Sequence, residues 1–173
     1  MKYEHSLLIR ILLCFIPLSL LTWILTPITL KLSYITLLYY NPILISADVM
    51  VINGIPFSFI EACIATSAYY LIILLVLLTK EITLKQRIKL IFIGSILILL
   101  MNLLRIFILI FVTVNYGFYW FEIIHLAFWK FVSGIYIALV WILLVRYYKI
   151  KSVPVYDDIK YLFNKSYFKK YFR

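Results

Sequence analysis

The chain has 173 residues, of which 66% are hydrophobic, and its mean hydropathy is +1.07. Soluble domains contain about 45–50% apolar residues, so a water-soluble fold of this size could not bury so much apolar surface. The formal net charge is +10, but the basic residues lie between and after apolar runs rather than on one folded face. This arrangement is typical of a membrane protein and argues against nucleic-acid binding.

Four apolar runs are long enough to cross a bilayer, which takes about 20 helical residues. They cover residues 7–25, 59–78, 84–114 and 125–145. Pro17 lies inside the first run and predicts a kink there. The sequence therefore predicts an all-α integral membrane protein, a bundle of about four transmembrane helices.

The stretch 31–58, between the first two predicted spans, is mixed in character. Residues 32–44 are apolar but short and interrupted by Pro42, which favours an interfacial position over a fifth span. Asn53-Gly54 between apolar residues is a hairpin turn signal, and Pro56 restricts the following strand to a sheet edge. We expect a small hairpin or interfacial segment here.

The distribution of lysine and arginine predicts the orientation. Basic residues are concentrated before the first span, between the second and third, and after the fourth, whereas the first of the other loops holds only Lys31. Cytoplasmic loops carry an excess of basic residues, so we expect both termini in the cytoplasm and the hairpin segment outside, in a multi-pass protein of the cell membrane. Residues 1–150 would form the transmembrane domain.

Residues 151–173 would form a cytoplasmic tail. From residue 160 onward this tail is both basic and aromatic, a composition that suits the surface of an anionic leaflet and its membrane lipids. A solvated tail is the alternative. Because the chain has two cysteines and two histidines, neither a disulfide framework nor a zinc site is expected, and no cofactor is predicted.

Cys63 has a distinctive local sequence. Ser58 and Glu61 fit a capping box, which would start a helix just before Cys63. The positive end of the helix dipole would then favour a thiolate. The alternative interpretation is a small buried apolar residue, and we assign that packing role to Cys14, which has no capping signal.

Arg105 lies deep within the third predicted span, where a charged side chain is costly and is functional by default. Asn102 precedes it by about one turn on the same helix face. The alternative role for Arg105 is a hydrogen-bonded clamp between helices. Glu122 and His125 are three residues apart, so on a helix the carboxylate could orient the imidazole; the alternative is an interfacial histidine in an aromatic belt.

Cys63, Arg105 and His125 come from three predicted helices and converge on the outer leaflet. Together they supply a thiol nucleophile, a fixed positive charge and a base, which are the groups that acyl transfer requires. The guanidinium could stabilise an oxyanion or hold the substrate. We therefore predict a catalytic site of Cys63, Arg105 and His125, supported by Asn102 and Glu122.

These segments resemble the exosortase/archaeosortase family of membrane cysteine transpeptidases. The matching segments are Asn53-Gly54-Ile55 leading to Glu61-Ala62-Cys63, then Asn102-Leu103-Leu104-Arg105-Ile106, then His125. Family members commonly have a small residue and a glycine after the cysteine, whereas Ile64-Ala65-Thr66 follows Cys63 here.

The resemblance implies a Cys–Arg–His active site at Cys63, Arg105 and His125. It also implies the partners: secreted protein substrates with C-terminal hydrophobic sorting tails, which family members cleave and transfer to a membrane lipid or another anchor. Two other classes stay open. One is a non-catalytic membrane subunit in which Arg105 and Glu122 organise helices or bind a lipid head group. The other is a small transporter or channel component.

Overall fold

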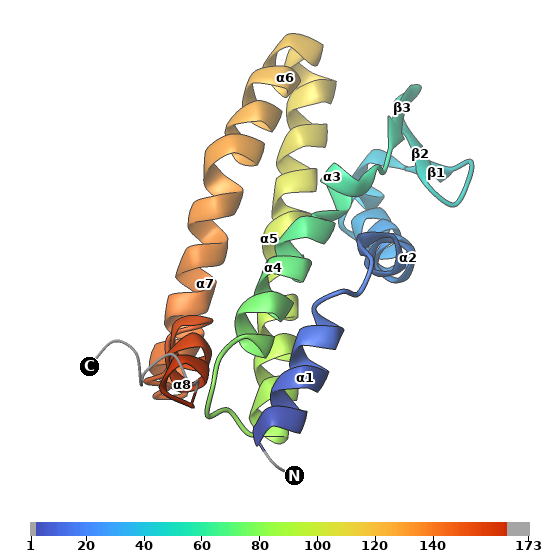
Figure 1. Ribbon diagram of the computed structural model, residues 1–173. Coiled ribbons are helices and arrows are strands. Elements are labelled where there is room, and N and C mark those ends of the chain that lie inside the picture. The colour runs from blue at the N-terminus through green and yellow to red at the C-terminus, as the bar shows by residue number, and fades with distance from the viewer. Residues whose placement is uncertain (1–2, 166–173) are drawn as a thin grey trace.

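The computed structural model describes residues 3–165 (Figure 1), and this part of the chain is mainly helical. Its α-helices are α1 (Tyr3–Leu13), α2 (Leu18–Thr36), α3 (Glu61–Ile64), α4 (Thr66–Leu77), α5 (Leu84–Tyr116), α6 (Phe118–Ala127), α7 (Ser133–Tyr147) and α8 (Tyr156–Lys165). A 3-10 turn covers Leu38–Tyr40, and a π-helical stretch, Phe128–Val132, joins α6 to α7. The strands are β1 (Ile43–Leu44), β2 (Val49–Ile52) and β3 (Ile55–Ser58).

Three helices within the described residues are long and apolar enough to cross a membrane. They are Leu18–Thr36, Leu84–Tyr116 and the continuous helix Phe118–Tyr147. The predicted span 59–78 is not one helix, because α3 ends at Ile64 and α4 begins at Thr66. α4 has 12 residues and is about 18 Å long, which is shorter than the ~30 Å hydrocarbon core of a bilayer. The helical membrane character is supported, whereas the described helices of spanning length number three rather than four.

The predicted first span, 7–25, consists of two helices. The chain leaves α1 in a turn at Cys14, and Pro17 is the N-cap of α2 with φ −67°. Proline has no N–H to donate and disfavours helical geometry in the residue before it, so Pro17 separates two helices instead of kinking one. The two helices point in different directions (Figure 1). α2 then continues past Pro27 to Thr36, well beyond the predicted end.

The hairpin prediction is confirmed. β2 and β3 pair antiparallel with Ile52 opposite Ile55, so Asn53 and Gly54 form a two-residue turn. Both turn residues have positive φ, 51° and 80°, as a type I′ turn requires. The sheet order is β1-β2-β3, so Pro56 lies on an edge strand, as predicted.

Two apolar clusters hold the helices and the sheet together. The first joins α4, α5 and α7 through buried residues such as Ile72, Leu90 and Val140. Gly94 allows this close approach, because a Cβ there would lie 3.0 Å from Cγ1 of Ile72. The second cluster packs the hairpin and α2 against α5, and its buried residues are Leu30, Leu37, Met50, Ile52, Phe59, Ile106 and Ile110. The sheet is therefore fixed beside the second half of α5.

α1 and α8 meet at the other end of the molecule (Figure 1). Arg10 of α1 forms a buried ion pair with Asp158 of α8, with Nη1–Oδ2 and Nη2–Oδ1 distances of 3.1 and 3.3 Å. Arg10 and Arg87 also donate to the carbonyls of Leu77, the last residue of α4, and of Thr79. The first part of the predicted tail is thus a docked helix. The basic and aromatic residues 166–173 lie outside the described residues, as does Lys2.

We expect Asp158→Asn to destabilise the protein. The substitution leaves the buried Arg10 guanidinium without its counter-charge, and removing one partner of a buried pair costs about 3–5 kcal/mol. Thermal unfolding in detergent measures the effect, and Glu81→Gln, at an exposed carboxylate, is the control. Equal midpoints for the two variants would show that the pair contributes nothing to stability.

Candidate functional site

The helical conformation is interrupted between α3 and α4, immediately after Cys63-Ile64. Ala65 adopts a left-handed conformation with φ 60° and ψ 33°, which ends α3 after one turn. The last carbonyls of α3 therefore accept no hydrogen bond from a following helical turn. Nη1 of Arg105 donates to the Ala62 carbonyl at 3.0 Å, and Nδ2 of Asn102 donates to the Cys63 carbonyl at 2.8 Å. We call Asn102 and Arg105 the α3 clamp.

The predicted capping box is wrong. Ser58 is the last residue of β3, so its backbone is extended within the sheet. Ile60 occupies the N-cap of α3, with no side-chain cap hydrogen bond. The Glu61 carboxylate instead accepts a hydrogen bond from the Thr22 hydroxyl at 3.3 Å. Cys63 therefore lies in an isolated turn held by tertiary contacts, rather than in the first turn of a long helix.

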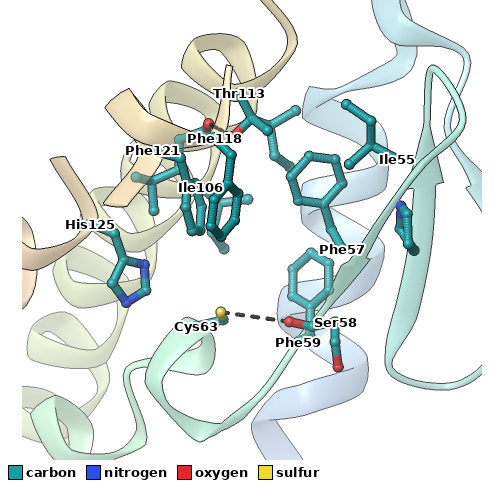
Figure 2. Close-up of a pocket in the computed structure, with 13 residues that line it drawn as sticks. Ile55, Phe57, Ser58, Phe59, Cys63, Ile106, Thr113, Phe118, Phe121 and His125 are labelled. Atoms are coloured by element: carbon teal, nitrogen blue, oxygen red, sulfur yellow. Dashed lines mark hydrogen bonds between the residues drawn. The ribbon is translucent and has the colours of Figure 1, made fainter. Parts of the chain in front are cut away.

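Cys63 and His125 line the same cavity, of about 180 Å³ (Figure 2). The walls come from β3, α5 and α6 and are mostly aliphatic and aromatic. Its residues are Ile55, Pro56, Phe57, Ser58, Phe59, Cys63, Ile106, Leu109, Ile110, Thr113, Phe118, Phe121 and His125. The Cys63 thiol lies 3.8 Å from the Ser58 carbonyl oxygen, its hydrogen-bond acceptor. The Cys63 thiol and the His125 imidazole, which are distant in the sequence, thus line one apolar cavity.

His125 lies in the last turn of α6, in the first third of the continuous helix Phe118–Tyr147. Its Nδ1 is buried and has no hydrogen-bond partner among the described residues. The Phe121 ring packs against the imidazole with centroids 5.3 Å apart. Glu122 is exposed, and no hydrogen bond joins it to His125 in residues 3–165. The Glu122 carboxylate therefore does not orient the His125 ring as predicted, and the ring packs against Phe121 instead.

Arg105 is buried, with 4% of its surface exposed. Its Nε and Nη2 have no partners within the described chain. The side chain does not line the Cys63 cavity; with Asn102 it borders a smaller hollow of about 30 Å³ near Phe128 and Tyr136. The guanidinium is nevertheless close enough to interact electrostatically with Cys63 and His125. The structure thus places this fixed charge behind α3, where it holds the Ala62 carbonyl.

The predicted residues form two layers. Cys63 and His125 face the cavity, and the α3 clamp lies behind them. Cys14 is in a separate region between α1 and α2, where its thiol donates to the Arg10 carbonyl at 3.2 Å. No group of three or more His, Cys, Asp or Glu residues within 3–165 is arranged to hold a metal ion.

Sequence reasoning missed a polar contact between α2 and the α3 segment. The Thr22 hydroxyl lies 3.3 Å from a Glu61 carboxylate oxygen and 3.2 Å from the Thr66 hydroxyl. Thr22 is distant in sequence from both partners and sits in an apolar helix without a local motif. The one available signal was a threonine inside an apolar run, which indicates a helix contact but not its partner.

Comparison with known proteins gives no match to this chain among family models, curated proteins or solved structures. The resemblance to the exosortase/archaeosortase family therefore stays a prediction from its short motifs.

Proposed function

We propose that this protein is a membrane cysteine peptidase or transpeptidase, with Cys63 as nucleophile and His125 as the proton carrier. The observation that supports this most is the shared cavity, into which both side chains open from α3 and α6. The buried Nδ1 of His125 has no partner in the described structure, which leaves it available to a substrate or to the thiol. Covalent acyl transfer needs a nucleophile and a base in one site.

The proposed reaction has two steps. His125 takes the thiol proton as the sulfur attacks an amide carbonyl, and a C–S bond forms. The C–N bond then breaks, and the leaving amine receives the proton from the imidazolium, which leaves a thioester on Cys63. In the second step an acceptor amine, hydroxyl or water attacks the thioester and its proton passes to His125. The C–S bond then breaks, and the imidazolium returns the proton to the sulfur, which regenerates the thiol. Because the walls are apolar, a free thiolate is disfavoured, and proton removal must accompany the attack.

Arg105 serves this reaction as a positioning residue. Its bond to Ala62, together with the bond from Asn102 to Cys63, holds both carbonyls of the turn that carries the nucleophile. Its buried positive charge also favours negative charge developing near Cys63, since electrostatic interactions strengthen in a low-dielectric site.

The proposed substrates are secreted proteins that carry a hydrophobic C-terminal sorting tail, with transfer of the new C-terminus to a membrane anchor. The apolar cavity walls and the resemblance to the exosortase/archaeosortase family support this class. We further propose a multi-pass arrangement in the cell membrane, with both termini cytoplasmic and the cavity on the outer face. The meeting of α1 and α8 at one end, with the sheet toward the other (Figure 1), is consistent with this orientation. The cavity is lined by β3, α5 and α6 and so lies on the side of the sheet.

Cysteine alkylation tests the proposed site without a known substrate. We expect iodoacetamide at neutral pH to label Cys63 several-fold faster than Cys14, because Cys63 shares a cavity with His125 and its hydrogen bond to the Ser58 carbonyl is long, at 3.8 Å, whereas the Cys14 thiol donates to the Arg10 carbonyl at 3.2 Å. His125→Ala should slow labelling of Cys63 and leave Cys14 unchanged, as measured by mass spectrometry of the folded protein in detergent.

Cys14 is the internal control in every sample. Equal, slow labelling of both cysteines in folded protein would contradict the catalytic proposal. It would favour the second candidate, a non-catalytic membrane subunit. The observation behind that candidate is the α3 clamp itself, since Asn102 and Arg105 satisfy backbone carbonyls as purely structural residues would.

A further inference from the structure

The hydrogen-bond pattern of the hairpin determines which backbone groups of β3 face outward. Ile52 and Ile55 flank the two-residue turn and so form a hydrogen-bonded pair, and Met50 with Phe57 is the next such pair. The pair between them, Val51 with Pro56, and the pair beyond them, Val49 with Ser58, therefore point their backbone groups away from the shared ladder. Independent contacts agree: the Val49 carbonyl accepts from the Ile45 amide on the β1 side at 3.1 Å, and the Phe59 amide donates to the Asp48 carbonyl at 2.7 Å.

The outer edge of β3 thus presents three groups that β2 leaves unpaired: the Pro56 carbonyl, the Ser58 amide and the Ser58 carbonyl. Both residues are exposed. Pro56 occupies one of the outward positions, where its missing N–H costs no ladder bond. An edge that offers one donor between two acceptors can pair with one extended polypeptide strand.

This edge adjoins the nucleophile. The Cys63 thiol contacts the Ser58 carbonyl itself, at 3.8 Å, and residues 55–59 form one wall of the cavity that Cys63 and His125 share. Figure 2 shows Ser58 beside Cys63, with Phe118 and Phe121 on the other side of the chamber. A strand bound along the edge would pass directly beside the thiol.

We infer that the cavity binds an extended apolar segment of another polypeptide as an added strand on β3, with its backbone paired to Ser58. This inference rests on the proposed function and specifies how the substrate binds. Because strand side chains alternate between faces, every second residue of the segment would pack against the apolar wall formed by Ile106, Ile110 and Phe121. A sorting tail would therefore have to present an unwound segment at the site of cleavage.

The test compares a peptide reagent with a small one. The probes are an acetyl-tripeptide chloromethyl ketone of apolar residues and iodoacetamide, both reacting with Cys63. Ser58→Pro removes the outward amide from the edge, and Ser58→Ala keeps that amide and is the matched control. We expect Ser58→Pro to slow the peptide reagent roughly two- to tenfold, the range for one backbone hydrogen bond, without changing labelling by iodoacetamide. Equal effects of the proline variant on both reagents would overturn the inference.

A second measurement does not depend on thiol chemistry. The same peptide ending in an unreactive amide is added to the Cys63→Ala protein, and hydrogen exchange of the Ser58 amide is followed by mass spectrometry. Slower exchange supports strand addition, and unchanged exchange at saturating peptide overturns it. Protection of Ser58 in the Cys63→Ala protein, together with resistance of Cys63 to both reagents in the unsubstituted protein, would retain the binding edge and refute the catalytic proposal.

Discussion

Replacing Cys63 with alanine is expected to abolish processing of substrate proteins, with a rate loss of at least ~10³-fold. The reason is that the thioester cannot form without the sulfur, and loss of a catalytic nucleophile removes most of an enzyme's rate enhancement. The fold should persist, because Cys63 is only half-buried and alanine is favourable in a helical turn. The measurement is mass spectrometry of secreted and membrane-bound proteins from cells that carry only the variant.

Cys14→Ala is the matched control for this experiment. It removes the other thiol of the chain, from the turn between α1 and α2, and should leave processing unchanged. Continued processing by the Cys63→Ala variant would refute the nucleophile. Loss of processing in both variants, together with lowered unfolding temperatures, would point to a structural effect instead.

Replacing Arg105 with leucine is expected to have the second largest effect. The substitution removes the charge-assisted hydrogen bond to the Ala62 carbonyl, worth about 1.5–3 kcal/mol, and it leaves that carbonyl without its guanidinium donor. It also removes the positive charge near Cys63 and His125. Because small misplacements of a nucleophile are costly, we expect a rate loss of about 10²-fold.

Two companion variants separate the contributions of Arg105. Arg105→Lys keeps the charge but replaces the planar fork with a point donor, so we expect partial recovery of the rate. Asn102→Leu removes the bond to the Cys63 carbonyl without altering charge, so it should lower the unfolding temperature with a smaller rate loss. The measurements are thermal unfolding and iodoacetamide labelling of Cys63. A leucine variant with normal labelling would mean that Arg105 has no influence on the nucleophile.

The role of Arg105 is where structure most changes the interpretation of the sequence. An arginine inside an apolar helix indicates function because of its insertion cost, and the sequence also left open a clamp between helices. The structure joins the guanidinium to the α3 backbone and keeps it out of the cavity that holds Cys63 and His125. Both interpretations therefore apply: Arg105 is a clamp by geometry, and we propose that it acts on the reaction through Cys63.

The sequence by itself determined the features that depend on solvent partitioning and local stereochemistry. The apolar composition predicted a membrane protein, with which the three long apolar helices are compatible, and the uninterrupted apolar run predicted α5 to within two residues at its end. Asn53-Gly54 predicted the hairpin, because few residue pairs accept positive φ at both positions. These signals act over a few residues, so they can be read before any tertiary contact is known.

Only the tertiary structure decided the features in which local preferences compete with contacts from distant segments. No glycine or proline at Ala65 indicates a helix break in the sequence. The break is stabilised because Asn102 and Arg105 donate hydrogen bonds to the carbonyls that it exposes. Glu61 does not cap α3, because pairing with β2 holds Ser58 extended in β3, and its carboxylate accepts from Thr22 of α2 instead. Each outcome depends on which polar group comes within hydrogen-bond distance after the helices pack, and that proximity is a property of the packed helices rather than of any local pattern.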